Sequence, residues 1–235
     1  MARHLVSIVL PVHNQADHIE GIVRSYEDAL ARVGEPDHEL ILVPNNCTDR
    51  SVDLCLGLAA AHPSVRVAPT ERGGWGHAVR LGLREAKGDF LCYTNSARTA
   101  PSDLVLLVLY ALANPGAVVK AHRRSRDSFT RRLGSFVYNL EVRGLFDLPA
   151  WDINATPKVF SREIYEAIGL TSDGDLIDLE FYVKCKRLGA LILEVPIYSG
   201  VRHGGVSTTS LRSAARMYWG AFRMYRSLRG RPPAA

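Results

Sequence analysis

The chain has 235 residues, 47% of them hydrophobic, and carries a formal net charge of +5 at pH 7. That length suits one substantial α/β domain and is short for two. The longest apolar run, residues 104–113, is shorter than the roughly 20 residues that span a bilayer, and residues 1–10 lack the pattern of a cleavable signal peptide. We therefore expect a cytoplasmic protein.

The charged and sulfur-containing residues narrow the classes of partner. Arginines cluster at 123–132 and again at 202–231, which suits anionic partners such as a nucleotide diphosphate, a lipid phosphate or a membrane surface, or else a solvated basic face. There is no zinc-finger spacing, aromatic RNA-binding strand or helix-turn-helix signature, so nucleic acid is not an expected partner. The cysteines have no C-x-x-C or metal-ligand spacing and are expected to be reduced and mostly buried: Cys47, Cys55, Cys92 and Cys185.

The first half of the chain alternates strands and helices. Its predicted elements are a strand at 5–12, a helix at 17–33 with Asp17 as N-cap, a strand at 39–44, a loop and helix within 45–62, a strand at 65–68, a helix at 77–88 and a strand at 89–94. Continuous apolar strands are typical of a parallel sheet buried on both faces. The alternation therefore predicts an α/β fold with a doubly wound, mostly parallel sheet.

The second half is less regular. Its predicted elements are a strand at 117–122, a helix at 127–145, a turn-rich connector at 151–161, a helix at 175–188, a strand at 191–199, a glycine-serine loop at 202–210 and a basic amphipathic helix at 208–229. Residues 1–207 are predicted to form the main domain, and residues 230–235 a disordered tail. Ligands of such sheets gather at the carboxyl ends of the strands, so the loops after Leu10, Val43 and Thr94 are the candidate site.

Six segments share their order and pattern with one enzyme family. They are VSIVLPVHNQADHI, ELILVPNNCTDRS, GGWGHAVRLGLREAKGDF, AHRRS, WDINATPKVFSREIYE and VRHGGVSTTS. From Val6 to about Tyr218 the chain resembles the inverting glycosyltransferases of family 2, which have the GT-A nucleotide-diphospho-sugar transferase fold. Within that family it looks most like the polyprenyl-phosphate branch typified by dolichol-phosphate mannose synthase.

The resemblance implies a donor and acceptor site. It assigns substrate binding to residues that match the family's motifs: Pro11, His13, Asn14, Gln15, Asn45, Gly74, Trp75, His77, Asn95, Ser96, Ala97, Arg98, Arg123, Lys158 and Ser207. Three of these have a second interpretation from the residues alone. Asn45 either contacts the base or forms an Asx turn, Trp75 either stacks on substrate or covers the core, and the glycines around it are weak evidence of a nucleotide site.

The chain departs from the family at its carboxylates. Gln15 replaces a Glu, Pro44 and Asn45 replace an Asp pair, and residues 95–97 (Asn-Ser-Ala) replace the metal-binding D-x-D motif. Neutral oxygens hold Mg²⁺ or Mn²⁺ weakly, so we assign no metal ligand and expect no tightly bound cation. Arginine is suited to bidentate phosphate contact, and we expect Arg98, Arg123 and Arg202 to neutralise the donor diphosphate instead.

The acceptor decides whether a catalytic base is needed. A hydroxyl must lose its proton as it attacks, whereas a lipid phosphate is already anionic. Asp178 is the predicted base for a hydroxyl acceptor, Asp152 is predicted to position substrate, and Arg202 completes the catalytic set. Asp175 is better explained as a helix-capping acid.

The predicted function is an inverting glycosyltransferase that moves a sugar from a nucleotide diphosphate sugar to a polyprenyl phosphate or a small hydroxylated molecule, as in natural-product assembly. The alternative is a catalytically inactive GT-A-fold binding subunit, because a fold does not establish chemistry. The C-terminal helix fits a peripheral contact at the inner membrane face, packing on its own domain, or a homodimer contact.

Overall fold

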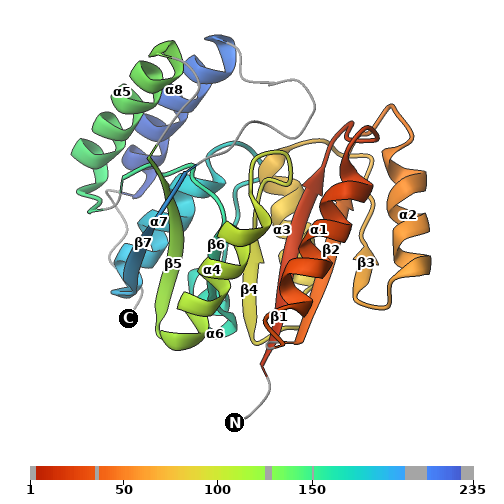
Figure 1. Cartoon of the computed structure of the whole chain (residues 1–235). Helices are drawn as coiled ribbons and strands as arrows, with labels where there is room; N and C mark the ends of the chain where they lie inside the picture. Colours follow the sequence, from red (N-terminus) through yellow and green to blue (C-terminus); the bar gives the residue numbers. More distant parts are fainter. Residues whose placement is uncertain (1–3, 35–36, 125–128, 150, 199–210, 229–235) are drawn as a thin grey trace.

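The computed structural model describes residues 4–34, 37–124, 129–149, 151–198 and 211–228, which form one seven-stranded sheet covered by helices (Figure 1). The strands are β1 (Leu5–Val12), β2 (Asp37–Pro44), β3 (Val65–Val67), β4 (Phe90–Tyr93), β5 (Ala117–Arg123), β6 (Lys158–Ser161) and β7 (Leu191–Ile197). The helices are α1 (Ile19–Ala31), α2 (Ser51–Ala61), α3 (Trp75–Glu85), α4 (Pro101–Ala113), α5 (Phe129–Phe146), α6 (Arg162–Ile168), α7 (Ile177–Leu188) and α8 (Leu211–Leu228).

The strand order is β3-β2-β1-β4-β6-β5-β7, and β6 is the strand that runs antiparallel to its neighbours. The predicted doubly wound, mostly parallel α/β fold is therefore confirmed. Because β6 is reversed, its first residue, Lys158, lies at the edge of the sheet where the parallel strands end. Lys158 pairs there with Tyr93, the last residue of β4.

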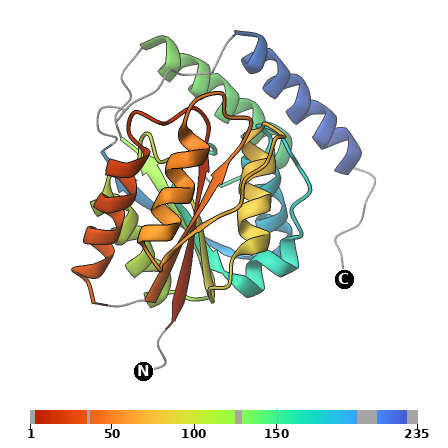
Figure 2. The ribbon, with the colours of Figure 1, turned by 90° about the vertical axis from the view of Figure 1, so that its right-hand side faces the viewer.

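Each face of the sheet has its own apolar core. Helices α1, α2 and α4 cover one face, with Tyr26, Leu58 and Leu107 among their buried side chains. Helices α3, α6 and α7 cover the other, and α5 and α8 lie side by side at the end of that layer, as both views show (Figures 1 and 2). This arrangement leaves the carboxyl edge of the central strands to loops.

Two local predictions were wrong. The first helix begins at Ile19 with His18 at the N-cap position, and no side chain caps it, so Asp17 is not the N-cap. The connector predicted for 151–161 contains β6, and the unpredicted α6 follows it directly, with the Ser161 hydroxyl accepting from the Ile164 amide.

The predicted C-terminal helix is present as α8. Its Tyr218 and Tyr225 rings meet Tyr138 and Phe146 of α5 edge to face, and the Tyr218 hydroxyl donates to the Gly134 carbonyl oxygen. Helix α8 thus packs on its own domain, one of the three roles expected for it. Among the described residues, no helix combines the length and apolarity needed to cross a bilayer. The predicted tail at 230–235 lies outside the described residues.

Candidate active site

The loops that follow β1 and β4 meet at the carboxyl edge of the sheet. The Ser96 hydroxyl donates to Gln15 Oε1 at 2.6 Å, and the Gln15 amide donates to the Ser51 hydroxyl at 2.8 Å. Gln15 stands where the family has a Glu, and Ser96 is the middle residue of the segment that replaces D-x-D. The structure therefore joins them with a hydrogen bond between neutral groups.

The loop after β4 uses its own polar atoms. Asn95 Oδ1 accepts from the Ala97 amide at 3.0 Å, and the Asn95 carbonyl oxygen accepts from the Arg98 amide at 3.1 Å. Ser96 and Ala97 are buried, and Arg98 is half-buried. A divalent cation would find at this loop an amide oxygen and a hydroxyl that are both already engaged, so the residues present do not fit an Mg²⁺ or Mn²⁺ site. Within the described part of the chain, no cluster of His, Cys, Asp and Glu could hold a metal ion.

The loop after β2 is held by Asn45. Its carboxamide nitrogen donates to the carbonyl oxygens of Val12 and Val43, and its Oδ1 accepts from the Gly74 amide at 3.3 Å. The Asn45 carbonyl oxygen accepts from His13 Nδ1 at 2.9 Å. Asn45 is buried, and its side chain joins the ends of three segments, which accounts for an amide here without a ligand.

Three more residues of the expected site lie at or near the loops after β1 and β2. Asn14 Oδ1 accepts from the Thr48 amide at 2.8 Å, so Asn14 links the loops after β1 and β2. Pro11 lies within β1, buried and in register with Val43. His77 Nε2 lies 3.3 Å from the Thr70 hydroxyl.

The glycines at the start of α3 make room for the protein's own backbone. A Cβ on Gly76 would lie 2.5 Å from the Gly174 carbonyl oxygen, and one on Gly74, whose φ is +134°, would lie 3.0 Å from the Asp173 carbonyl oxygen. The His77 amide donates to that same Asp173 oxygen at 2.9 Å. The glycines that were weak evidence of a nucleotide site are thus occupied by a contact with the loop before α7.

A row of charged and aromatic residues crosses the sheet at its carboxyl edge. Tyr93 pairs with Lys158, Lys158 with Lys120, and Lys120 with Glu194. Residues paired across neighbouring strands point to the same face of a sheet. All four side chains therefore project toward the layer of helices that contains α7, and both lysines are fully buried.

Lys158 and Asp178 form the centre of this row. The Lys158 ammonium donates to Asp178 Oδ1, which also accepts from the Tyr93 hydroxyl at 2.9 Å. The Trp75 indole N–H donates to Asp178 Oδ2 at 3.2 Å, and the rings of Tyr93 and Tyr182 lie 5.1 and 5.5 Å from the lysine nitrogen. Trp75, for which stacking on a substrate or covering the core was expected, is fixed by this carboxylate.

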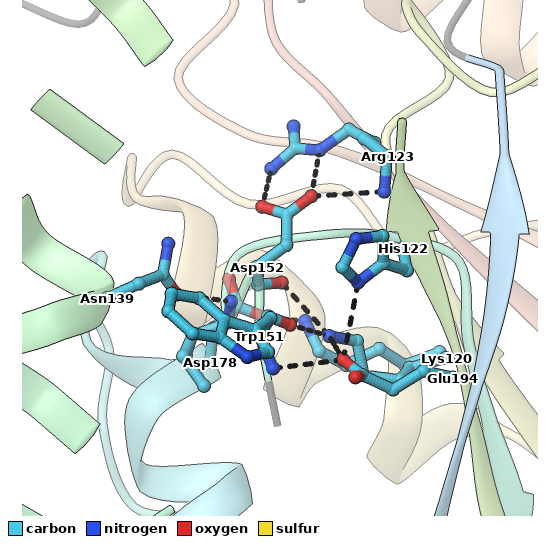
Figure 3. Close-up of polar contacts among 10 residues, drawn as sticks. Lys120, His122, Arg123, Asn139, Trp151, Asp152, Asp178 and Glu194 are labelled. Carbon is cyan, nitrogen blue, oxygen red and sulfur yellow. Dashed lines mark hydrogen bonds and ion pairs between the residues drawn. The ribbon is translucent and has the colours of Figure 1, made fainter. Parts of the chain in front are cut away.

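Arg123 and Asp152 form a second pair, shown in Figure 3. Arg123 Nε and Nη2 donate to the two Asp152 oxygens at 2.8 and 2.6 Å, and the Arg123 amide donates to Oδ2 at 3.3 Å. Asp152 has a φ of +50° and is buried. Most of the charge that Arg123 was expected to offer a diphosphate is therefore balanced by Asp152.

Lys120 and Glu194 form a third pair beneath the second. The Lys120 ammonium donates to Glu194 Oε1 at 2.7 Å and to the carbonyl oxygens of Trp151 and Asp152. Glu194 Oε1 also accepts from the Trp151 amide at 3.0 Å (Figure 3). The turn that presents Asp152 to Arg123 is thus held by a buried ammonium.

Burial controls the ionisation of these groups. Loss of solvent lowers the pKa of Lys120 to about 8, although Glu194 opposes the shift, and it lowers the pKa of Lys158 against the opposing effect of Asp178. Burial alone lowers the pKa of Arg123 too, but the Asp152 carboxylate outweighs it and the net shift is upward. Glu194, Asp178 and Asp152 each favour the charged form of the cation that they bind.

The sequence predicted Asp152, Asp178, Arg123 and Lys158 without their pairing. It missed Lys120 and Glu194, although each is an isolated charge inside a predicted apolar strand, and such charges need a partner. Two expected residues, Arg202 and Ser207, lie outside the described residues.

The sheet order, the reversed strand and the polar loops at the carboxyl edge define a GT-A fold of the nucleotide-diphospho-sugar transferase class. The crystal structure of glucosyl-3-phosphoglycerate synthase from Mycobacterium tuberculosis with Mn²⁺, UDP and phosphoglyceric acid has this fold, with a TM-score of 0.72 and 21% identity over 97% of this chain and 80% of that one. The chain itself belongs to glycosyl transferase family 2, whose family model matches residues 7–169. The resemblance inferred from the six segments is thus confirmed.

Two curated relatives fall in the expected branch. The undecaprenyl-phosphate 4-deoxy-4-formamido-L-arabinose transferase of Pectobacterium carotovorum is 27% identical over 69% of this chain and 50% of its own length. The dolichol-phosphate mannosyltransferase of Pyrococcus furiosus is 24% identical over 86% of this chain and 58% of its own length. The chain therefore spans only about half the length of the curated relatives it matches.

Proposed function

We propose that the chain transfers a sugar, with inversion, from a nucleotide diphosphate sugar to a polyprenyl phosphate, and that it does so without a tightly held divalent cation. The observation that carries the proposal is the pairing of carboxylates with cations around the carboxyl edge. Lys158 neutralises Asp178, and Arg123 neutralises Asp152. The names of the two curated relatives support the same acceptor class.

The acid pairing favours an acceptor that is already ionised. A base must accept a proton as the hydroxyl attacks, whereas the oxygens of Asp178 already accept from Lys158, Tyr93 and Trp75 and those of Asp152 from Arg123. Asp173, in the loop before α7, is likewise paired with cations, Arg72 and Arg80. A lipid phosphate requires no proton removal, so it fits this site better than an alcohol does. We therefore assign Asp178 and Asp152 to positioning.

Cationic side chains are proposed to take the place of the metal at the donor diphosphate. Unit charges about 4 Å apart attract by about 4 kcal/mol at an effective dielectric near 20, before desolvation is subtracted. Arg98 belongs to the loop after β4, which has no acid, and Arg202 to the segment that resembles the family's phosphate-covering loop. Fixed cations that face a departing diphosphate stabilise the charge that develops on it.

Helix α8 is proposed to bring the domain to the surface of a membrane. It carries four arginines and no acid, and Trp219 and Phe222 are exposed on it. Arginine near anionic lipid contributes about 1 kcal/mol per residue, and tryptophan favours the interface. A peripheral contact would place the site near a lipid-borne acceptor.

Two measurements test the proposal. Calorimetry with UDP, GDP and their sugars should give an affinity that EDTA leaves unchanged, and a radiolabelled sugar should appear on a polyprenyl phosphate but not on small alcohols. Activity that EDTA abolishes and Mn²⁺ restores would contradict the metal-independent part. Transfer to alcohols alone would contradict the acceptor.

The loss of the family's acids also favours a second candidate, a GT-A-fold subunit that binds a nucleotide sugar without transferring it. Nucleotide binding without any transfer, across donors and both acceptor classes, would favour this candidate over the enzyme.

A further inference from the structure

Trp151 and Asp152 form a turn whose backbone is held by side chains from two strands. The Lys120 ammonium of β5 donates to the carbonyl oxygens of both residues, and Glu194 of β7 accepts from the Trp151 amide at 3.0 Å. Lys120 and Glu194 are cross-strand partners and bond each other at 2.7 Å (Figure 3). One ion pair therefore binds the turn through its carbonyl groups and through an amide.

The same turn sets the direction of a guanidinium. Asp152 has a φ of +50°, a conformation that costs energy in a residue with a side chain, and its carboxylate binds Arg123 Nε and Nη2. Among the described residues, Arg123 Nη1 has no hydrogen-bond partner (Figure 3). The position of the Asp152 carboxylate thus decides which way the remaining N–H groups of Arg123 point.

Packing alone does not account for a charge at Lys120. The side chain is fully buried, and an apolar residue of similar volume would fill its space without the cost of taking an ammonium out of water. Three oxygens accept from the ammonium, one for each of its N–H groups. The surroundings are therefore matched to a charged lysine that binds the turn.

We propose that Lys120 and Glu194 are positioning residues for sugar transfer, because they hold the turn that carries Asp152 and so set the orientation of Arg123. The proposal rests on the proposed function, in which Asp152 has a positioning role. Lys120 has no exposed surface, so its effect reaches a substrate only through the turn.

The charge of Lys120 makes this positioning depend on pH. Burial lowers the pKa of Lys120 to about 8, and Glu194 opposes the shift. Other titratable or charged groups face Lys120 or Glu194 from the neighbouring elements: Lys158 on β6, Asp152 in the connector, Tyr182 on α7 and His122 on β5. A neutral amine has two N–H groups for the same three oxygens, so one contact is lost as the pH rises through 8.

Glu194→Gln tests the proposal through the pH profile of transfer. The carboxamide keeps the shape of the side chain, and Glu194 is partly exposed, so the variant should fold. In the wild type, kcat/KM for transfer of a radiolabelled sugar to a polyprenyl phosphate should fall as the pH rises through 8. Without the Glu194 charge the fall should begin about one pH unit lower, which makes kcat/KM roughly fivefold smaller than the wild type's at pH 8 and nearly equal at pH 6.

Glu39→Gln is the matched control. Glu39 is a buried carboxylate that also binds a cation, Arg66, and a backbone amide, that of Lys87, but it lies near the amino end of β2. Its replacement should lower the free energy of unfolding and leave the fall in kcat/KM near pH 8. A purely structural role of Glu194 would give this same result for both variants.

Nuclear magnetic resonance gives a readout that does not need activity. The carbon-detected Nε–Cζ signal of Arg123 is the one missing from Arg123→Lys. While Asp152 holds the guanidinium, rotation about the Nε–Cζ bond is hindered and the two Nη nitrogens give separate signals. These signals should merge as the pH of the wild type rises through 8, and at a lower pH in Glu194→Gln.

Four results would overturn the proposal. They are a wild-type profile that stays flat from pH 7 to 9.5, a fall that does not move in Glu194→Gln, an equal movement in Glu39→Gln, and Arg123 signals that do not change near pH 8. If the wild type transfers no sugar, the proposed function fails, and the Arg123 signals still decide whether Lys120 and Glu194 orient the guanidinium.

Discussion

Lys158 shows how one side chain sets the character of this site. Moving an ammonium out of water costs several kcal/mol, and contacts with the Asp178 carboxylate and the Tyr93 and Tyr182 rings offset that cost. Replacement of a whole buried pair is often tolerated, but removal of one partner leaves an unpaired charge. The Lys158–Asp178 pair therefore fixes the positions of these two side chains, and the stability of the folded protein depends on both members.

Asp178→Ala is expected to lower the free energy of unfolding by about 3–5 kcal/mol, because it leaves the Lys158 ammonium buried without its partner. Urea denaturation at pH 7 measures the change. Asp175→Ala is the control, since Asp175 is exposed three positions earlier and does not cap α7 as expected, the N-cap being Leu176 without a side-chain hydrogen bond; it should change stability by less than about 0.5 kcal/mol. Equal effects of the two substitutions would show that the pair is not formed.

Glu180 should make the protein sensitive to acid. Burial raises its pKa, but Lys184, Thr171 and Ser172 together outweigh this and bring the value to about 2, below the ordinary 4.5. A depressed pKa gives stability that is present above pH 4.5 and is lost as the pH falls toward 2. The contribution is about 3 kcal/mol by linkage.

Urea unfolding of the wild type and Glu180→Gln between pH 7 and pH 2 tests this. The difference in free energy of unfolding between the two proteins should be constant above pH 5 and should shrink by about 3 kcal/mol as the pH falls below it. A gap that stays unchanged down to pH 2.5 would contradict the assignment.

At this scale the sequence predicts residue types better than it predicts partners. The replacement of acids by Gln15, Asn95 and Ala97 predicted a site edge without carboxylates, and the structure joins Gln15 to Ser96, the residue between the last two. The pairing of Tyr93 with Asp178 was not predictable, because the two residues are 85 positions apart and meet only once α7 packs on the sheet.

The position of helix α3 depends on the absence of a side chain at Gly76. Without a Cβ at Gly76, the first turn of α3 approaches the backbone at Gly174, and the loop before α7 follows it. That contact places Trp75 beside Asp178. The glycines therefore serve packing between α3 and α7 in the first instance.

Gly76→Ala should destabilise the protein by about 1–3 kcal/mol, because the added methyl group overlaps the Gly174 carbonyl oxygen. Gly57→Ala in α2 is the matched change, since nothing lies within 4 Å of its added Cβ. It should stabilise by up to about 1 kcal/mol through helix propensity. Thermal unfolding compares the two, and a stabilising Gly76→Ala would contradict the packing.

Elements that are buried and continuous were predicted well from sequence, and short ones were not. The apolar run of β1 gave its bounds directly. Strand β6 is only Lys158–Ser161 and begins with a lysine, so neither its length nor its pattern indicated a central strand. Strand β6 is buried because it lies between β4 and β5, and its own sequence does not indicate that burial.

The whole molecule combines a sheet with two covered faces and a less enclosed pair of helices. Strands β1 and β4 are almost entirely buried, whereas α5 and α8 leave Phe136, Leu140 and Trp219 exposed. Regions with little buried apolar surface open at lower free energy than the core.

Amide hydrogen exchange should therefore be slowest in β1 and β4 and markedly faster in α5 and α8. Mass spectrometry of peptic fragments resolves these segments. Exchange as slow in α8 as in β1 would contradict this hierarchy.

Because β6 runs in the reverse direction, the short link from Asp152 to Lys158 sets the distance between two charge pairs. Its first end is fastened to Arg123 and its second to Asp178, so both charge pairs are spaced by the same few residues. A strand that slips by one position turns every side chain to the opposite face. Deleting a single residue from this link would turn the Lys158 ammonium into the apolar core under α4. The length of the link is therefore constrained together with the two charge pairs.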